Sequence, residues 1–277
     1  NGLALHLILF ISNMFANYFD NHWIVENTLS IDNGHIIGND INCQVSVNGD
    51  AYAATDTVKI IANHIYNFNG NGIVYSNDEH YVEICNNYIY ADYQSYYPIN
   101  ISNMRNVAGG SNLITNNTLD SSTSSDNSYY YSIYITDTSG DGQNLIIANN
   151  VCEQGISAVN GMANAYIANN YYTTGSGITG FGNSLLYDNY GNISVSGTPM
   201  FSTTTGIVSG VSNTGLDWIE FRDIDNTINN VGTGGGPHAW SNYHPTQGKA
   251  AIVDLELPHQ LYIGGVHSVK AKAIHKN

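Results

Sequence analysis

The sequence predicts an all-β solenoid in which short parallel strands stack coil upon coil. Three observations lead to this fold class. A short phrase keeps recurring, its copies are spaced like solenoid repeats, and the apolar residues do not follow helical spacing. The phrase is an aliphatic residue, any residue, and then Asn, as in IIANN at 146–150 and YIANN at 166–170. Repeats of about 20 to 50 residues are typical of solenoids.

The recurring asparagines mark the expected turns between coils. Successive copies lie 19 to 33 residues apart. A weaker signal, Gly-Ile or Ser-Ile, lies between many of them, as at Gly72, Ser132, Gly155 and Gly177. The phrase places its polar residue at Asn39, Asn63, Asn86, Asn116, Asn149 and Asn169, and at Asp188 in a degenerate copy.

The aliphatic residues occur in short alternating runs such as LIIANN and VEICNN, which is the pattern of strands. Residues 1–200 contain no run with helical spacing that reaches ten residues. Asn and Gly tolerate left-handed backbone conformations, so they can turn the chain between strands. Stacked Asn amides can hydrogen-bond along the axis as a ladder. We therefore interpret these asparagines as structural, and His64, which follows Asn63, as a turn residue.

This pattern resembles the right-handed parallel β-helix family, whose coils often read I-x-N-N-x-I. The resemblance covers roughly residues 1–200 and implies a parallel β-helix there. The same scaffold carries pectate-lyase-like enzymes, epimerases, phage tailspikes and bacterial surface proteins. The resemblance therefore implies a fold and leaves the function open.

The repeat is lost after Asn192, and residues 201–277 are expected to form a small C-terminal β cap or module. A turn-rich stretch comes first, and alternation over Ala251, Val253 and Leu255 then indicates strands. The segment FRDIDNTINNVGTGGGP at 221–237 resembles the closing motif of many secreted bacterial β-helix proteins. That resemblance implies a cap at the end of the solenoid and an extracellular or cell-surface location in a bacterium.

The closing motif contains the candidate metal ligands Asp223 and Asp225. Two carboxylates in a D-x-D turn can bind Ca²⁺, which is the one cofactor that the sequence indicates. The alternative is a turn held by hydrogen bonds to the same carboxylates. His238 and His244 are a weaker metal signal, because they lie six residues apart in a loop.

Composition limits the partners. The chain has 277 residues, 42% of them hydrophobic and only 10% charged, and its net charge is −15. This charge repels nucleic acid, anionic membranes and polyanionic glycans, but it tolerates neutral glycans. No run is long enough for a membrane-spanning helix, so we expect no membrane insertion. The odd set Cys43, Cys85 and Cys152 is expected to be buried and unbridged.

The longest gaps follow Asn86 and Asn116, and their extra residues are rich in tyrosine. Both insertions follow the turn in successive coils, so they should lie side by side. Tyrosine offers an apolar face and a hydroxyl, which suits contact with glycans or with protein. Burial against the flank of the solenoid is the other possibility. The candidate ligand-binding residues are Tyr93, Tyr96, Tyr97, Tyr129, Tyr130 and Tyr131.

The catalytic signals are weak. A lyase for acidic polysaccharides needs cations, and residues 1–217 contain only Lys59 and Arg105. A glycoside hydrolase needs two carboxylates at a set separation. The carboxylates we considered form no recognisable pair; they are Asp78, Glu79, Glu83, Asp137 and Asp141.

The sequence therefore favours a structural or adhesive β-helix protein over an enzyme. The apolar run at 3–10 has no polar cap, so we expect identical subunits stacked head to tail, or upstream coils of a longer chain, to cover it. The alternative is a polysaccharide-degrading enzyme that acts on a neutral glycan. A carboxylate pair beside the tyrosines would favour the enzyme.

Overall fold

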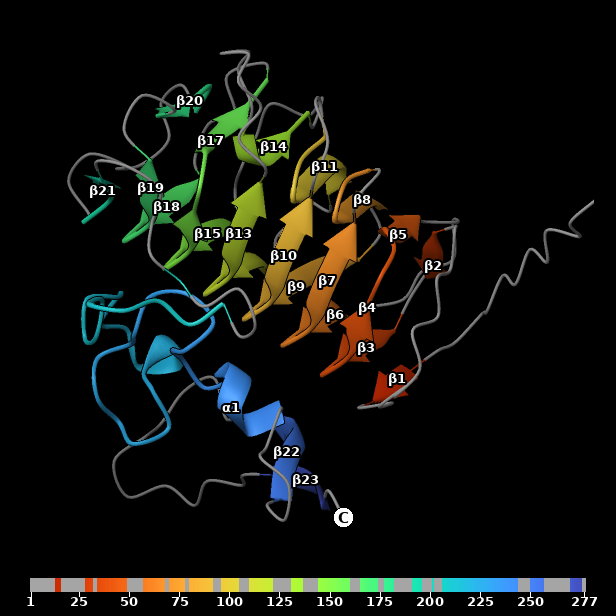
Figure 1. The fold of residues 1–277 in the computed structure, drawn as a ribbon, viewed down its shortest axis with the longest axis vertical. Coiled ribbons are helices and arrows are strands. Elements are labelled where there is room, and N and C mark those ends of the chain that lie inside the picture. The colour runs from red at the N-terminus through yellow and green to blue at the C-terminus, as the bar shows by residue number, and fades with distance from the viewer. Residues whose placement is uncertain are drawn as a thin grey trace, which may run out of the picture.

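A computed structural model of the chain forms an all-β parallel β-helix, which confirms the predicted fold class (Figure 1). Three parallel sheets of seven strands each make up the coils, and each complete coil contributes one strand to each sheet. The structure describes residues 13–15, 28–31, 34–48, 57–67, 70–77, 80–91, 96–104, 110–121, 131–136, 144–159, 165–173, 177–181, 191–195, 201, 206–243, 250–256 and 270–275.

The strands of each sheet follow one another coil by coil. Sheet A contains β1 (Asn13–Phe15), β3 (His35–Ile37), β6 (Thr57–Ile61), β9 (Tyr81–Cys85), β12 (Asn112–Thr115), β15 (Leu145–Ala148) and β18 (Tyr166–Ala168). Sheet B contains β2 (Leu29–Ile31), β5 (Val45–Asn48), β8 (Ile73–Asn77), β11 (Ile99–Met104), β14 (Tyr131–Ile135), β17 (Gly155–Ala158) and β20 (Ile178–Thr179). Sheet C contains β4 (Asp40–Ile41), β7 (His64–Asn67), β10 (Tyr88–Ala91), β13 (Thr118–Ser121), β16 (Val151–Cys152), β19 (Tyr171–Thr173) and β21 (Ile193–Val195).

Columns of β-branched residues fill the interior. In sheet A, Ile60 pairs with Ile36 on one side and Ile84 on the other, and all three are buried. In sheet B, Ile99 lies between Ile73 and Ile133, so the weaker Gly-Ile and Ser-Ile signal does mark a second column. Branched side chains are stiff and pack well on a pleated surface, which explains why these short strands form.

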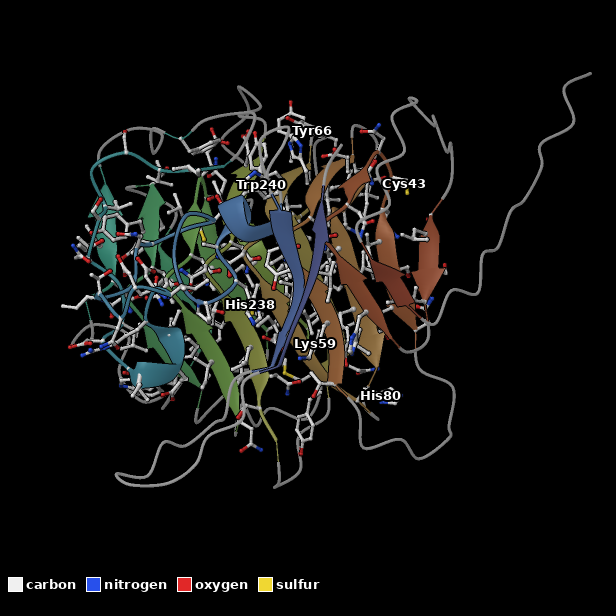
Figure 2. The ribbon with its side chains drawn as sticks, turned by 90° about the horizontal axis from the view of Figure 1, so that it is seen from below. Cys43, Lys59, Tyr66, His80, His238 and Trp240 are labelled. Atoms are coloured by element: carbon white, nitrogen blue, oxygen red, sulfur yellow. The ribbon has the colours of Figure 1, made fainter. Side chains whose placement is uncertain are left out.

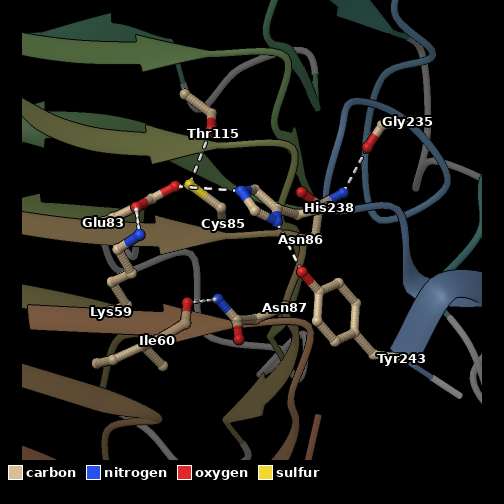
Figure 3. Close-up of polar contacts among 10 residues, drawn as sticks. All are labelled: Lys59, Ile60, Glu83, Cys85, Asn86, Asn87, Thr115, Gly235, His238 and Tyr243. Atoms are coloured by element: carbon tan, nitrogen blue, oxygen red, sulfur yellow. Dashed lines mark hydrogen bonds and ion pairs between the residues drawn. The ribbon is translucent and has the colours of Figure 1, made fainter. Parts of the chain in front are cut away.

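A ladder of asparagines, all of them buried except the last, runs along the turn between sheets A and C. From the second asparagine on, the amide oxygen accepts bonds from the backbone N–H and the Nδ2 of the ladder residue one coil earlier. For the step from Asn87 to Asn63 both distances are 3.0 Å. The Nδ2 of Asn87 also donates to the carbonyl of Ile60 at 2.7 Å (Figure 3). The ladder consists of Asn39, Asn63, Asn87, Asn117, Asn150, Asn170 and Asn192.

The residue before each ladder asparagine has a positive φ and forms a second column, the outer column. Its members are Gly38, Ala62, Asn86, Asn116, Asn149, Asn169 and Gly191, with φ between 52° and 77°. The prediction that Asn86, Asn116, Asn149 and Asn169 share one turn column is therefore confirmed.

The recurring phrase predicted a single turn column, and this is wrong at the first coils. There the asparagine of the phrase, Asn39 or Asn63, belongs to the ladder, whereas in the later coils it belongs to the outer column. His64 is consequently not a turn residue, because it begins β7 and pairs with Tyr88 of β10. Asp188 lies outside the described residues, and Gly191 with Asn192 makes the turn in that coil.

Residues 206–243, here called the strap, run along the side of the coils from Asn169 back to Gly38. The Nδ2 of Asn169 donates to the carbonyl of Thr214 at 3.0 Å, and Tyr243 packs on Gly38. This path differs from the cap that we expected over the end of the solenoid. The physical reason is that the outer column offers side-chain amides along the flank. Figure 1 shows the strap beside the sheets.

The strap holds a short 3₁₀ helix, η1 (Ile219–Phe221), and a single helical turn, α1 (Trp240–Tyr243). An antiparallel pair follows, β22 (Ala250–Glu256) with β23 (Lys270–His275), as the alternation of the sequence predicted. In the part of the chain that the structure describes, no helix is long and apolar enough to cross a membrane.

Candidate functional site

The outer asparagines attach the strap to the coils by side-chain hydrogen bonds. The Nδ2 of Asn116 donates to the side-chain oxygen of Asn229 at 2.7 Å and to the carbonyl of Asn230 at 2.9 Å. The amide oxygen of Asn149 accepts the backbone N–H of Leu216 at 2.7 Å. A residue of the left-handed turn thus both shapes the coil and positions the strap.

A charged cluster joins the strap to the outer face of sheet A (Figure 3). Lys59 and Glu83 are paired residues of β6 and β9, and their Nζ and Oε2 atoms lie 3.6 Å apart. The Nε2 of His238, from the strap, lies 3.5 Å from the other oxygen of Glu83. The Nδ1 of His238 is 2.7 Å from the hydroxyl of Tyr243.

The charged cluster has the residue types of an acid–base site, but its geometry is that of a contact that holds the strap against the coils. Each oxygen of Glu83 faces a basic side chain, and the Glu83 and His238 side chains are only 15% and 14% exposed. Glu83 was one of our candidate carboxylates, and here its ion-pair partners are Lys59 and His238 rather than a second acid. The candidates Asp78, Glu79, Asp137 and Asp141, and the cation Arg105, lie outside the described residues.

Cys85 lies beside this cluster, with its sulfur 3.1 Å from the hydroxyl of Thr115 (Figure 3). Burial raises the pKa of the Cys85 thiol well above its usual value. Burial also raises the pKa of Cys43 and of Cys152. All three cysteines are free and buried, as predicted, and a protonated buried thiol is not a nucleophile.

Asp223 and Asp225 lie in the strap and organise its loop. Asp223 accepts the backbone N–H of Gly236 at 2.6 Å and the Nδ2 of Asn230 at 2.6 Å. Asp225 accepts the hydroxyl of Thr227 at 2.6 Å. Burial raises the pKa of Asp223, whereas the bonds from Thr227 lower the pKa of Asp225.

These contacts are those of the hydrogen-bonded turn that was the alternative to a metal site. The described residues contain no group of three or more His, Cys, Asp or Glu side chains able to hold a metal ion. His244, the other half of the weak histidine signal, lies outside the described residues. Binding of Ca²⁺ by Asp223 and Asp225 stays a prediction.

The tyrosine insertions meet on the outer face of sheet B. The rings of Tyr97 and Tyr134 stack with centroids 4.4 Å apart, and Tyr131 lies parallel to Tyr134 at 6.1 Å. We call Tyr97, Tyr131 and Tyr134 the tyrosine stack, and all three are half-buried. Tyr96 is also half-buried, while Tyr93, Tyr129 and Tyr130 lie outside the described residues.

The tyrosine stack shows that the two insertions lie side by side where the structure describes them. Sequence reasoning missed Tyr134, which pairs with Asn100 in the neighbouring coil. Its signal was its place one residue beyond the Ser-Ile pair of the sheet B column.

A second polar and aromatic surface lies on the outer face of sheet C. Tyr66 of β7 pairs with Tyr90 of β10, which in turn pairs with Asp120 of β13. The two tyrosine rings are 5.7 Å apart, and all three side chains are half-buried. We call Tyr66, Tyr90 and Asp120 the sheet C row.

Asp120 is held in place by two neighbours. The hydroxyl of Tyr88 donates to one Asp120 carboxylate oxygen at 2.8 Å. Burial, with the charge of Asp120 as a smaller cause, raises the pKa of Tyr88, so this hydroxyl stays protonated and donates. Glu153, in the next coil, accepts the backbone N–H of Ser121 at 2.9 Å and so fixes the chain next to Asp120.

Asp120 and Glu153 are neighbours in adjacent coils, since Leu119 and Cys152 pair directly before them. Sequence reasoning missed this pair of carboxylates. The signal was present, because each lies three residues after its ladder asparagine, as Tyr66 and Tyr90 do. This common offset of three residues is visible only when the ladder asparagines are separated from the outer column.

His64 connects the sheet C row to the strap. Its ring meets Tyr66 of the row edge-on at 4.2 Å and Trp240 of the strap edge-on at 5.7 Å, and it also stacks on Tyr88 at 4.8 Å. The Nδ1 atom lies 3.3 Å from a carboxylate oxygen of Asp40. Figure 2 marks Trp240 and His238 in the strap, where it passes over the strands. The His64 ring is therefore packed among aromatic side chains of sheet C and of the strap.

Comparisons of the chain with protein-family models, with curated proteins and with solved structures found no match. The function is therefore inferred from the geometry of the charged cluster, the tyrosine stack and the sheet C row.

Proposed function

We propose that this chain is an extracellular structural or adhesive β-helix that stacks end to end with identical subunits and contacts neutral glycans or proteins through its tyrosines. One observation carries the proposal. The cluster that most resembles an active site, Lys59 with Glu83 and His238, fastens the strap to the coils. Because the acid and both bases of this cluster contact one another between the strap and the coils, they support a structural role over a catalytic one.

The ends of the three sheets support stacking. Among the described residues, β18, β20 and β21 are the last strands of sheets A, B and C. A last strand carries backbone groups that can pair with a further strand. A second copy placed there would continue all three sheets. Contacts of this head-to-tail kind build filaments unless their rotation closes a ring.

The outer faces support contact with uncharged partners. The tyrosine stack presents half-buried rings and hydroxyls on sheet B. The net charge of −15 disfavours polyanions, so neutral glycans and protein surfaces suit it better. The extracellular location rests on the resemblance of residues 221–237 to closing motifs of secreted proteins.

Light scattering and electron microscopy of the purified chain test the assembly. We expect the scattered mass to rise with concentration and filaments to appear. A stable monomer at high concentration would overturn the stacking. Co-sedimentation with insoluble neutral polysaccharides tests adhesion, with Tyr97→Ala and Tyr134→Ala as variants of the tyrosine stack.

A glycoside hydrolase is the second candidate, favoured by the neighbouring carboxylates Asp120 and Glu153. Paired parallel strands lie about 4.8 Å apart, and retaining glycosidases hold their two carboxyl groups about 5 Å apart. Against it, Glu153 is only 7% exposed and already accepts a backbone N–H from Ser121. Release of reducing ends from neutral polysaccharides, abolished by Asp120→Asn and by Glu153→Gln, would favour this candidate.

A further inference from the structure

We propose that the sheet C row binds an extended neutral oligosaccharide that lies along the axis of the solenoid, with one sugar unit over each coil. This rests on the glycan-contact part of the proposed function and names its site. The row is Tyr66, Tyr90 and Asp120, which follow one another in register on β7, β10 and β13.

The spacing of the row fits a linear chain of sugars. Successive members lie about 4.8 Å apart along the axis, as paired strands do. This is close to the length of one unit in an extended β-1,4-linked chain. A ligand aligned with the axis would therefore repeat its contacts from coil to coil, whereas a ligand running across the coils would meet only one member.

The tyrosines supply the apolar contact. Tyr66 and Tyr90 are half-buried, and their rings are tilted by 52° at a centroid distance of 5.7 Å. Tyr66 packs against both Tyr90 and Tyr88, and these contacts hold the rings in place before a ligand arrives. Rings fixed in this way lose little conformational entropy on binding, which favours affinity.

Asp120 supplies the polar contact. Tyr88 holds one carboxylate oxygen, Oδ2, which leaves Oδ1 to accept a sugar hydroxyl. Hydrogen bonds to a charged acceptor are stronger than neutral ones. Glu153 is a positioning residue here, because its carboxylate binds the backbone N–H of Ser121.

The charge of the site selects an uncharged sugar. The sheet C row carries one carboxylate and no cation, and the residue beside it in the next coil is the acid Glu153. A uronic acid at any unit would place like charges close together, which is unfavourable. Neutral β-1,4-linked hexasaccharides are therefore the expected ligands, and oligogalacturonides should not bind.

Isothermal titration tests the site with cellohexaose, xylohexaose, mannohexaose and N-acetylchitohexaose, each compared with its disaccharide. We expect at least one hexasaccharide to bind, and its disaccharide to bind more weakly because it fills only two of the three subsites. Asp120→Asn and Tyr66→Ala should each weaken binding by about tenfold, the loss of one charge-assisted hydrogen bond or ring contact. Tyr66→Phe keeps the ring and should bind nearly as the unchanged chain does.

Tyr166→Ala is the matched control, because it removes a half-buried tyrosine from sheet A, away from both the sheet C row and the tyrosine stack. It should leave hexasaccharide affinity unchanged. No binding of any neutral hexasaccharide, or equal losses in Tyr166→Ala and Tyr66→Ala, would overturn the inference. Thermal unfolding confirms that each variant is folded. Filaments that persist while saccharide binding is absent would overturn this site alone and leave the proposed assembly standing.

Discussion

Two adjacent asparagines in each central coil have different physical roles. Asn117 is a ladder residue, fully buried and bonded to the coils on both sides. Asn116 has a φ of 56° and bonds outward to the strap. In the doubled asparagine of the recurring phrase, the first residue therefore turns the chain and bonds to the strap, and the second connects adjacent coils.

Replacing a ladder asparagine should be far more costly than replacing its neighbour. Asn117→Ala leaves the Asn87 amide and the Ile84 carbonyl without their partner, so we expect a loss of about 3–5 kcal/mol in the free energy of unfolding. Asn116→Gly tolerates the left-handed turn and loses only strap contacts, at about 1–2 kcal/mol. Urea unfolding of both variants measures the difference, and equal losses would contradict the separate roles.

The pKa shifts of the cysteines predict that their thiols are unreactive in the folded chain. Burial raises the pKa of Cys85 and Cys152, so both thiols remain protonated through the neutral and mildly alkaline range. We expect neither to react with a thiol-specific reagent at pH 8 in the folded chain, and both to react after unfolding in urea. Rapid labelling of either in the folded chain would show that its coil opens.

At the scale of single residues, the sequence predicted the buried asparagines and cysteines because both follow from a repeated local pattern. It missed the roles of His64, Asp120 and Glu153. Their roles depend on which of two adjacent asparagines sets the register, and the first coils have only one asparagine in the phrase. Gly38 and Ala62 occupy the outer column there, and neither identifies the column by its side chain.

The strap is the element whose place could not be predicted. Its composition indicated turns, and the resemblance of residues 221–237 indicated an end cap. Its path is set by side-chain amides on the coils, such as those of Asn86 and Asn116, whose outward direction a sequence does not reveal. The strands of the coils were predictable because each repeats the same alternation of apolar and polar residues.

Loosening the strap should leave the coils intact. Glu83→Gln removes the charge that faces Lys59 and His238, and for a partly exposed pair we expect a loss of at most about 1 kcal/mol. Hydrogen exchange should rise in residues 236–243 and stay unchanged in β12 and β15. As a matched control, Glu220→Gln changes an exposed acid of the strap that does not face the coils and should alter neither region. Uniform acceleration across the coils in Glu83→Gln would show that the charged cluster stabilises the solenoid itself.

At the scale of the whole molecule, low charge and regular stacking belong together. A coil presents few charged side chains, so successive coils approach without strong repulsion although the net charge is −15. Among the described residues, the outermost strands of the three sheets at the C-terminal side are β18, β20 and β21. The apolar run at 3–10 precedes β1 in the sequence and lies outside the described residues.

End-to-end stacking should therefore depend on apolar residues near the N-terminal side and be indifferent to those on the flank. Leu7→Asp and Ile8→Asp place a charge in the run at 3–10, where the approach of another copy would bury it at a cost of several kcal/mol. We expect filaments of the unchanged chain to be lost in both variants. Ile207→Asp makes the same kind of change at an exposed position of the strap and should leave filaments intact.

Electron microscopy and sedimentation velocity measure filament formation in these variants, with circular dichroism to confirm folding. Filaments that persist in Leu7→Asp and Ile8→Asp would contradict stacking at this end. An unchanged chain that stays monomeric would instead favour coverage of that end by upstream coils of a longer chain.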